Sequence, residues 1–276
     1  MINKRIGIIG CGNMGEALLN RLSTVLEKST SLMASEIDAT RRELLQTKYK
    51  IIVQFDNNYL LKNSDVVILA VKPKDVYALL QNEVCCGISK DKLLISIAAG
   101  ITTKHIESIV GKDIPVIRVM PNMPALIGEA ISSISAGSAA TKEDVEIAKD
   151  IFSTIGEVVE VDEGLVDSVT AISGSGPAYF FYFVEALIQA AKDLGLKEAV
   201  AIKLVLKTAL GSSKLLYASG EGPDTLIQKV ASKGGTTEAA LKVFENKKFK
   251  NIVKTACRQA YKRSKELCRK WHVCSR

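Results

Sequence analysis

KRIGIIGCGNMGEALLNRL, residues 4–22, combines a short apolar run with three spaced glycines and a helix-forming segment. The glycines have the G-x-G-x-x-G spacing, which allows a tight turn, a close approach to a pyrophosphate and close packing of helix on strand. The following helix then directs its N-terminus at the phosphates. A purely structural glycine turn is the alternative. We predict a coenzyme loop formed by Gly10, Cys11, Gly12, Asn13, Met14 and Gly15.

The first 162 residues alternate between strand and helix patterns. Runs such as VVILAV (66–71) are apolar on both faces, as strands of a parallel sheet covered by helices must be. The pattern predicts an α/β Rossmann-type N-terminal domain over residues 1–162. Further strands are expected at 31–36, 51–55, 65–73, 93–100 and 115–124, with helices near 38–48, 73–83 and 102–110.

In open sheets of this kind, ligands bind at the carboxyl ends of the strands. We expect the segments 98–100 and 120–122 to lie beneath the nicotinamide. The rule selects as coenzyme-binding candidates Ser35, Glu36, Val71, Lys72, Pro73, Ala98, Ala99, Gly100 and Asn122.

The choice of coenzyme depends on the residues that follow the second strand. Glu36 lies twenty-one residues beyond Gly15, where an acid would hold the ribose 2′-hydroxyl of NAD. Ser35 with Arg41 and Arg42 would instead hold the 2′-phosphate of NADP. A third interpretation makes Glu36 a solvent-exposed residue that caps the next helix. These residues alone leave the three interpretations open.

From residue 163 onward the strand signals stop and helical patterns follow. A helix starting near Pro177 is apolar on nearly every side between Ala178 and Ala191. Such a helix must be buried on every side, and a small helical region has few places to bury it. We therefore predict an all-α C-terminal dimerisation domain over residues 163–276, and a homo-oligomer built from dimers through these helices. Burial within a single chain is the alternative.

The stretch SKGGTTEAAL (232–241) places two glycines and two threonines directly before a helix. The first N–H groups of a helix lack internal partners, and the helix dipole adds positive charge there. Glycines let the backbone curl so that these N–H groups converge on a small anion. A substrate carboxylate is the natural candidate, because the other glycine loop already accounts for the pyrophosphate. A helix capped by Ser or Thr after a flexible turn is the alternative.

The net charge of +7 is concentrated at the C-terminus. Residues 247–276 hold eleven Lys or Arg and one acid, so the rest of the chain carries −3. Apolar residues at helical spacing, from Val253 to Trp271, predict an amphipathic last helix with a solvated basic face. We favour this interpretation over a nucleic-acid or membrane-surface patch, and expect neither nucleic acid nor membrane as a partner.

The six cysteines, at 11, 85, 86, 257, 268 and 274, have no metal-ligand or disulfide-framework spacing. Neither histidine has a second ligand nearby in the sequence, so we expect no metal site. No apolar run reaches the ~20 residues of a membrane span, and the N-terminus enters a strand without a signal-peptide pattern. The expected localisation is therefore cytoplasmic.

Six stretches together resemble the Δ1-pyrroline-5-carboxylate reductase family, in the order and at the separations of that family. SGSGPAY and GGTTEAAL are specific to it, whereas the others also occur in related dehydrogenases. The resemblance implies reduction of the cyclic imine to L-proline by hydride transfer, the last step of proline biosynthesis. It implies NADP(H) as coenzyme, with NAD(H) as the alternative. The stretches are IGIIGCGNMGEAL, VVILAVKP, SIAAGIT, VIRVMPNMPA, AISGSGPAY and SKGGTTEAAL.

The resemblance also implies roles for individual residues. Glu163 matches an acid near the substrate, and Asn57 and the run Ala70, Val71, Lys72, Pro73 match positions that line the coenzyme. Lys233 departs from the family, where many members have proline. Thr237 would lie near the ring nitrogen and is the candidate catalytic residue. The substrate carboxylate would be held by Gly234, Gly235, Thr236 and Thr237.

Two other functions compete with this one. A β-hydroxyacid dehydrogenase has the same two-domain plan, but this chain has Phe180 where the lysine of that family would stand. Without this lysine an alcohol substrate has no acid–base partner. The second alternative is a non-catalytic nucleotide-binding relative, and the presence of both the coenzyme loop and the carboxylate nest argues against it.

Overall fold

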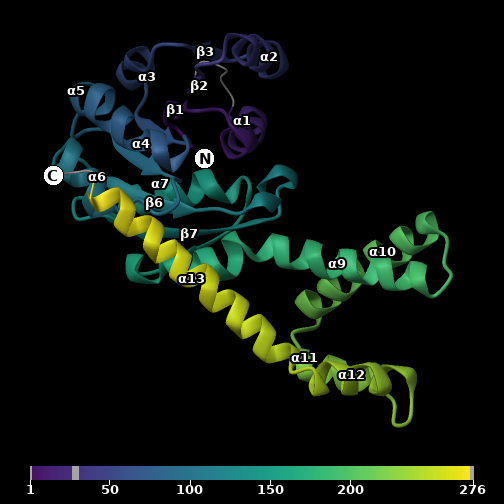
Figure 1. The fold of residues 1–276 in the computed structure, drawn as a ribbon. Helices are drawn as coiled ribbons and strands as arrows, with labels where there is room; N and C mark the ends of the chain where they lie inside the picture. The colour runs from purple at the N-terminus through teal and green to yellow at the C-terminus, as the bar shows by residue number, and fades with distance from the viewer. Residues whose placement is uncertain (1, 27–30, 274–276) are drawn as a thin grey trace. The chain divides into compact units, whose positions relative to one another are not determined.

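The protein consists of two compact units, shown in a computed structural model that describes residues 2–26 and 31–273 (Figure 1). The first unit contains residues 1–175 together with 260–276, and the second contains residues 176–259. Residues 163–175 and the described residues 260–273, which the sequence analysis assigns to the helical domain, thus pack within the first unit. The proposed division of the chain at residue 162 stays a prediction.

An eight-stranded sheet forms the centre of the first unit, with the strand order β3-β2-β1-β4-β5-β6-β7-β8. The first six strands pair in parallel, as their two-sided apolar sequences predict. The strands are β1 (Ile6–Ile9), β2 (Leu32–Ser35), β3 (Ile52–Gln54), β4 (Val66–Leu69), β5 (Leu93–Ser96), β6 (Val116–Met120), β7 (Ala130–Ala136) and β8 (Gly156–Glu160).

Helices connect these strands. Several are short, and a π-helical turn interrupts the segment that the sequence predicts as one helix over 73–83. They are α1 (Asn13–Val25), α2 (Ala39–Tyr49), α3 (Asn57–Asn63), α4 (Pro73–Leu79), η2 (Leu80–Val84), α5 (Cys85–Gly87), α6 (Thr103–Val110), η3 (Met123–Ile127), α7 (Lys142–Ser153), η4 (Glu163–Leu165), α8 (Val166–Val169) and η5 (Thr170–Gly174).

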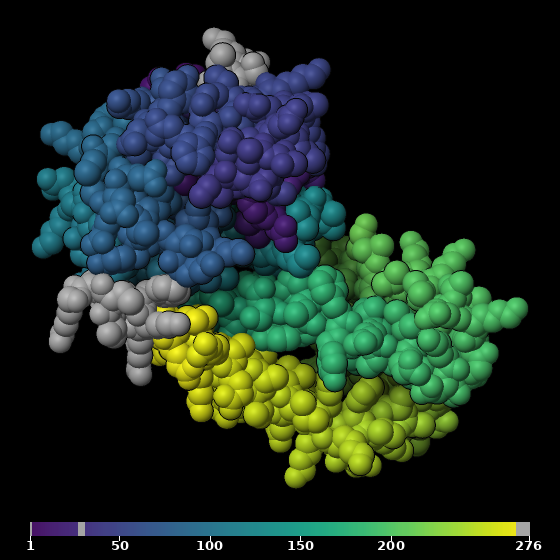
Figure 2. Space-filling view, turned by 45° about the horizontal axis from the view of Figure 1, so that its top comes forward, coloured from purple at the N-terminus to yellow at the C-terminus, as the bar shows by residue number. Residues whose placement is uncertain are grey.

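Two apolar cores lie on opposite faces of the sheet, because successive strand residues point to opposite sides. In β4, Val66 and Ile68 belong to the core that contains side chains of α1, α2 and α7. Val67 and Leu69 belong to the core that contains side chains of α3, α4 and α6. Helices thus cover both faces, and in Figure 2 the purple and blue residues of this unit form one closely packed body.

The strand β7 departs from the parallel pattern. It pairs antiparallel with β6, with Met120 opposite Ser133, and parallel with β8. Only nine residues separate β6 from β7, which is too short for the crossover that a parallel pair requires. The helix α7 supplies such a crossover between β7 and β8.

The second unit is helical, as the sequence predicts. Its helix α9 begins one residue before Pro177, the predicted start. No helix in the described ranges combines the length and the apolar content that a bilayer span needs. The helices are α9 (Gly176–Asp193), α10 (Glu198–Ser219), α11 (Pro223–Val230), α12 (Thr236–Asn246) and the N-terminal part of α13 (Phe249–Val273).

The C-terminal part of α13 belongs to the first unit. The Ser264 hydroxyl, which is buried, donates a hydrogen bond of 2.5 Å to the Asp167 carboxylate in α8. A Cβ on Gly100 would lie 3.4 Å from the Cys268 backbone nitrogen, so this part of α13 passes close to the loop after β5. The helix therefore contacts the Rossmann-type unit through its face at Ser264, which lies within the stretch from Val253 to Trp271. The side chain of Trp271 lies outside the described residues.

Candidate active site

The coenzyme loop between β1 and α1 has the backbone geometry that its glycines predict. Gly10 adopts a φ of +91°, and its N–H donates to the Ser35 carbonyl at 2.9 Å, which joins the ends of β1 and β2. A Cβ on Gly15 would overlap the Gly10 carbonyl oxygen, so α1 packs directly against the turn. A Cβ on Gly12 would meet nothing within 4 Å.

The open space at Gly12 is where a pyrophosphate would approach the N-terminus of α1. Gly12 is the N-cap of this helix, and no side chain of the described residues caps it. Its first N–H groups, from Asn13 and Met14 onward, are therefore available for an external acceptor. The residues present fit the diphosphate of a nicotinamide dinucleotide.

Cys11 lies in this loop with its side chain fully buried. Burial, and then the charge of Glu36, raise the pKa of the Cys11 thiol to about 12. The thiol is therefore neutral near pH 7, and its contribution to the site is made by its backbone. The Cys11 N–H donates to Glu36 Oε2 at 3.1 Å, and the Cys11 carbonyl accepts from Arg41 Nε at 2.6 Å.

The interpretation of Glu36 as a solvent-exposed helix cap is wrong. Its side chain is only 12% exposed, because the carboxylate turns toward the loop and accepts the Cys11 N–H. The N-cap of α2 is Asp38, whose side chain accepts the Arg41 N–H. Glu36 therefore lies between the coenzyme loop and α2, at the position where a ribose hydroxyl would need an acceptor.

Ser35 and Asn57 form a polar chain beside Glu36. The buried Ser35 hydroxyl donates to Asn57 Oδ1 at 2.5 Å, and Asn57 Nδ2 donates to Glu83 Oε2 at 2.8 Å. The chain connects β2, α3 and the π-helical turn η2. Glu83 was not predicted, because its pairing with a residue twenty-six positions away depends on how η2 packs on α3.

The segment from Ala70 to Pro73 follows β4 beside the coenzyme loop. The Ala70 N–H donates to the Ile9 carbonyl at 2.8 Å, and Val71 lies against the turn at Gly10. Lys72 is the N-cap of α4, and Pro73 begins that helix, as its missing N–H predicts. This segment thus adjoins Gly10 at the carboxyl edge of the sheet.

The segments after β5 and β6 lie along the same edge. Ala98 is buried, Ala99 follows it, and Gly100 adopts a φ of +77°. The Asn122 side chain donates to the Ser173 carbonyl at 3.2 Å and accepts the Ile131 N–H at 3.0 Å. Asn122 therefore fixes β7 and the turn before α9, which is a structural contribution that the sequence did not indicate.

Glu163 lies in the first unit, at the N-terminus of α6. Its carboxylate accepts from the Thr103 N–H at 2.8 Å, from the Thr103 hydroxyl at 2.6 Å and from Arg118 Nη1 at 3.2 Å. Arg118 is buried at 3% exposure, so this ion pair is shielded on the arginine side. Thr103 and Arg118 were not predicted, because Thr103 lies just outside SIAAGIT and the place of Arg118 within VIRVMPNMPA does not indicate a contact with Glu163.

The predicted carboxylate nest lies in the second unit. Gly234 adopts a φ of +73°, and Gly235 is the N-cap of α12, which no side chain of the described residues caps. Thr236 and Thr237 begin that helix. The Gly234 N–H donates to Glu238 Oε2 at 2.5 Å, so a carboxylate of the chain itself already occupies one donor.

Among the described residues, no cluster of three or more His, Cys, Asp or Glu side chains has the arrangement of a metal site. The structure places the predicted coenzyme residues of the first unit, from Gly10 to Asn122, at the ends of its parallel strands and in the loops and helix starts that follow them. The nest from Gly234 to Thr237 belongs to the second unit, and its approach to the coenzyme residues stays a prediction.

Comparisons with known proteins find relatives for both parts of the chain. Residues 163–267 match the family model "Pyrroline-5-carboxylate reductase dimerisation", and residues 5–100 match "NADP oxidoreductase coenzyme F420-dependent". Pyrroline-5-carboxylate reductase of Synechocystis sp. is 40% identical over 272 residues, which cover 96% of this chain and 99% of the relative.

Two solved structures have the same fold over nearly their whole length. The pyrroline-5-carboxylate reductase of Coxiella burnetii has a TM-score of 0.89 at 32% identity, covering 96% of this chain and 98% of that one. The Plasmodium falciparum enzyme, solved with NADP bound, has a TM-score of 0.87 at 31% identity, covering 97% and 99%. The chain therefore belongs to the pyrroline-5-carboxylate reductase family.

Proposed function

We propose that this chain reduces Δ1-pyrroline-5-carboxylate to L-proline with NAD(P)H, the last step of proline biosynthesis. The observation that carries the proposal is the 40% identity to a pyrroline-5-carboxylate reductase over nearly the full length of both chains. The open backbone cradle at Gly12 and the uncapped start of α12 at Gly235 support it.

The first unit would hold the coenzyme. The pyrophosphate is assigned to the N–H groups at the start of α1, and the adenosine ribose to Glu36 with Ser35 and Asn57 beside it. The segments Ala70–Pro73 and Ala98–Gly100, with Asn122, are assigned to the nicotinamide half. The Plasmodium falciparum relative was solved with NADP bound, which supports NADP(H) as coenzyme with NAD(H) as the alternative.

The second unit would hold the substrate. The carboxylate of the imino acid is assigned to the N–H groups of Gly234, Gly235, Thr236 and Thr237. The helix dipole of α12 adds to this attraction. A substrate carboxylate would replace that of Glu238, which accepts the Gly234 N–H in the structure. Glu163 is assigned to the substrate end of the first unit.

The reaction makes modest demands on the side chains. The coenzyme supplies the hydride when bound, and a protonated imine is already electrophilic. Orientation of the imine and stabilisation of its charge therefore account for most of the acceleration. The Thr237 hydroxyl is proposed to hydrogen-bond the ring nitrogen, which fixes the face of the imine that receives the hydride.

The test follows the absorbance of NADPH or NADH while the full-length enzyme consumes Δ1-pyrroline-5-carboxylate. Thr237→Ala is expected to lower kcat/KM by about 10²–10³, the range for loss of one preorganised donor. Thr237→Ser keeps the hydroxyl and serves as the matched control. Near-normal turnover by Thr237→Ala would exclude the proposed contact, and no turnover by the unaltered enzyme would overturn the function.

We also propose that the protein is a homo-oligomer built from dimers through the C-terminal helices. Phe180, Phe181 and Tyr182 of α9 are 68%, 59% and 76% exposed in the single chain. Contiguous apolar exposure of this kind is typical of an interface. The matched dimerisation model covers these helices, and residues 163–276 are proposed as the domain that carries both the nest and the interface.

The proposed compartment is the cytoplasm. The five cysteines in the described part of the chain are free thiols outside any disulfide, which supports a reducing environment.

The rival function, that of a β-hydroxyacid dehydrogenase, receives no support from the structure. Phe180 stands, exposed, at the position where that family has its lysine.

A further inference from the structure

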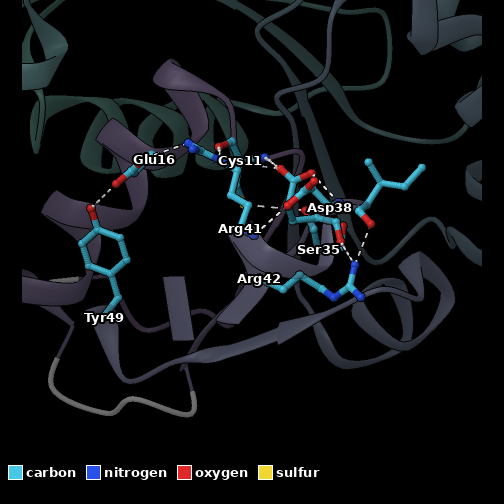
Figure 3. Close-up of polar contacts among 9 residues, drawn as sticks. Cys11, Glu16, Ser35, Asp38, Arg41, Arg42 and Tyr49 are labelled. Atoms are coloured by element: carbon cyan, nitrogen blue, oxygen red, sulfur yellow. Dashed lines mark hydrogen bonds and ion pairs between the residues drawn. The ribbon is translucent and has the colours of Figure 1, made fainter. Parts of the chain in front are cut away.

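Glu16, in the first turn of α1, accepts hydrogen bonds from three side chains of α2. Its Oε2 accepts from Arg41 Nη2 at 2.8 Å, and its Oε1 accepts from Lys48 Nζ and from the Tyr49 hydroxyl, both at 2.9 Å. Figure 3 shows the Glu16 carboxylate between the Tyr49 hydroxyl and the Arg41 guanidinium. The coenzyme assignment above does not use this cluster.

Glu16 is charged near neutral pH. Burial alone would raise the pKa of its carboxyl, but the hydrogen bonds from Lys48 and Tyr49 and the charges of Lys48 and Arg41 lower it overall. The side chain is 22% exposed, so its attraction for Arg41 is only partly screened by water.

The Arg41 guanidinium contacts three acceptors of the chain. Besides the Glu16 contact, its Nε donates to the Cys11 carbonyl at 2.6 Å and lies 4.0 Å from Glu36 Oε2. Arg42 is also held by the protein, because its Nη1 donates to the carbonyls of Glu36 and Ile37. Acceptors of the chain thus already engage both guanidinium groups after β2.

This arrangement bears on the ribose of the coenzyme, which in sheets of this kind binds at the end of β2. A 2′-hydroxyl is neutral and suits the Glu36 carboxylate. A 2′-phosphate is an anion that repels Glu36 and needs a cation, and Arg41 is the guanidinium nearest that carboxylate. To bind the phosphate, the Arg41 guanidinium would have to leave the ion pair that it forms with Glu16.

We propose that Glu16 is a positioning residue for coenzyme specificity, which holds Arg41 back from a 2′-phosphate and so disfavours NADP(H) relative to NAD(H). The proposal rests on the proposed NAD(P)H-dependent reduction. Glu16 would thereby weaken the binding of NADP(H) relative to NAD(H) without excluding NADP(H) from the site.

The test compares the full-length protein with its Glu16→Gln variant, which keeps the shape but removes the charge. The dissociation constants of NADPH and NADH are measured by calorimetry, and KM and kcat for both coenzymes with the imine substrate. Glu16→Gln is expected to strengthen NADPH binding roughly fivefold relative to NADH, the order of one partly exposed ion pair. The change should appear in KM for NADPH and leave kcat and the NADH values unchanged.

Two further variants separate this effect from a general loss of structure. Tyr49→Phe removes another partner of Glu16 but leaves the ion pair between Glu16 and Arg41 in place. The affinity for NADPH relative to that for NADH should therefore stay as in the unaltered protein. Adding Arg41→Met to Glu16→Gln should remove the gain, since the gain depends on the freed guanidinium. Raising the salt concentration should reduce the gain as well.

The outcomes distinguish this inference from the proposed function. If the affinity for NADPH relative to that for NADH is unchanged or lower in Glu16→Gln, the inference is overturned. A lower relative affinity for NADPH would mean that Glu16 orients Arg41 toward the phosphate. If the imine is not reduced but both coenzymes bind, the proposed function is wrong and the binding constants still decide the inference. Failure of both coenzymes to bind would overturn both.

Discussion

At the scale of single residues, the three glycines of the coenzyme loop make separate contributions. Gly10 needs a positive φ, Gly15 needs the absence of a Cβ so that α1 can touch the turn, and Gly12 faces open space. Only Gly12 is proposed to serve a ligand directly. The same sequence motif therefore contains residues for folding and a residue for binding.

Gly12→Ala and Gly15→Ala should separate these contributions. Gly12→Ala places a methyl group where the pyrophosphate approaches, so coenzyme affinity should fall roughly tenfold or more through weakened charge-assisted hydrogen bonds. The free energy of unfolding should change by less than about 1 kcal/mol, since the position is an extended N-cap. Calorimetry of coenzyme binding and denaturant unfolding measure the two effects.

Gly15→Ala is the matched comparison. Its methyl group would overlap the Gly10 carbonyl oxygen, so the free energy of unfolding should fall by about 1–3 kcal/mol through overpacking. A Gly12→Ala protein that binds coenzyme as tightly as the unaltered one would contradict the assignment of the pyrophosphate to this cradle.

Individual contacts show where prediction from the sequence stops. The motif spacing predicts that Glu36 lies near the coenzyme loop, and the structure places its carboxylate on the Cys11 N–H. The capture of Arg41 by Glu16 was not predicted, because two side chains twenty-five positions apart meet only through the packing of α1 beside α2. Motifs report local backbone geometry, whereas such pairings depend on tertiary packing.

At the scale of elements, the strands of the first unit follow from their apolar runs, although their predicted lengths are too great. The run 65–73 contains β4 only over Val66–Leu69, because the residues that follow leave the sheet to form the loop before α4. The antiparallel pairing of β7 was not predicted, since strand orientation depends on connection length rather than on side chains. The π-helical turn η2 likewise has no signal in the apolar periodicity.

The helix α9 is predicted to carry the subunit interface. Phe181→Asp would place a charge in the interface, where loss of one buried aromatic side chain commonly costs about 2 kcal/mol or more. The protein should shift from dimers or larger assemblies toward monomers, as measured by sedimentation or by light scattering after gel filtration. Leu44→Asp in α2, a residue with similar exposure of 53%, is the control and should leave the mass unchanged.

The single-chain alternative for α9 makes the opposite prediction. If these side chains need no partner subunit, Phe181→Asp and Leu44→Asp should sediment alike. Dissociation of the Leu44→Asp protein would instead place the interface on the first unit, which would contradict the proposed use of the C-terminal helices.

At the scale of the whole molecule, the two predicted ligand sites lie in different compact units. The coenzyme candidates from Gly10 to Asn122 belong to the first unit, with its own sheet and cores, and the nest from Gly234 to Thr237 belongs to the second. Hydride transfer needs both ligands together, but the binding of each ligand depends on its own unit. A substitution in one unit should therefore change the binding of that unit's ligand and the rate of turnover, but leave the binding of the other ligand unchanged.

Thr237 belongs to the second unit and is assigned to the substrate, whereas the coenzyme residues belong to the first unit. Thr237→Ala should therefore leave the dissociation constant of NADPH unchanged within about twofold, the effect of a surface substitution worth about 0.5 kcal/mol or less, while kcat/KM for the imine falls as proposed. Gly12→Ala should weaken coenzyme binding but leave the binding of proline, the product, unchanged. Calorimetry with NADPH and with proline on both variants measures this separation. If Thr237→Ala weakens NADPH binding as much as Gly12→Ala does, then the nest also contacts the coenzyme, and the assignment of residues 234–237 to the substrate carboxylate is wrong.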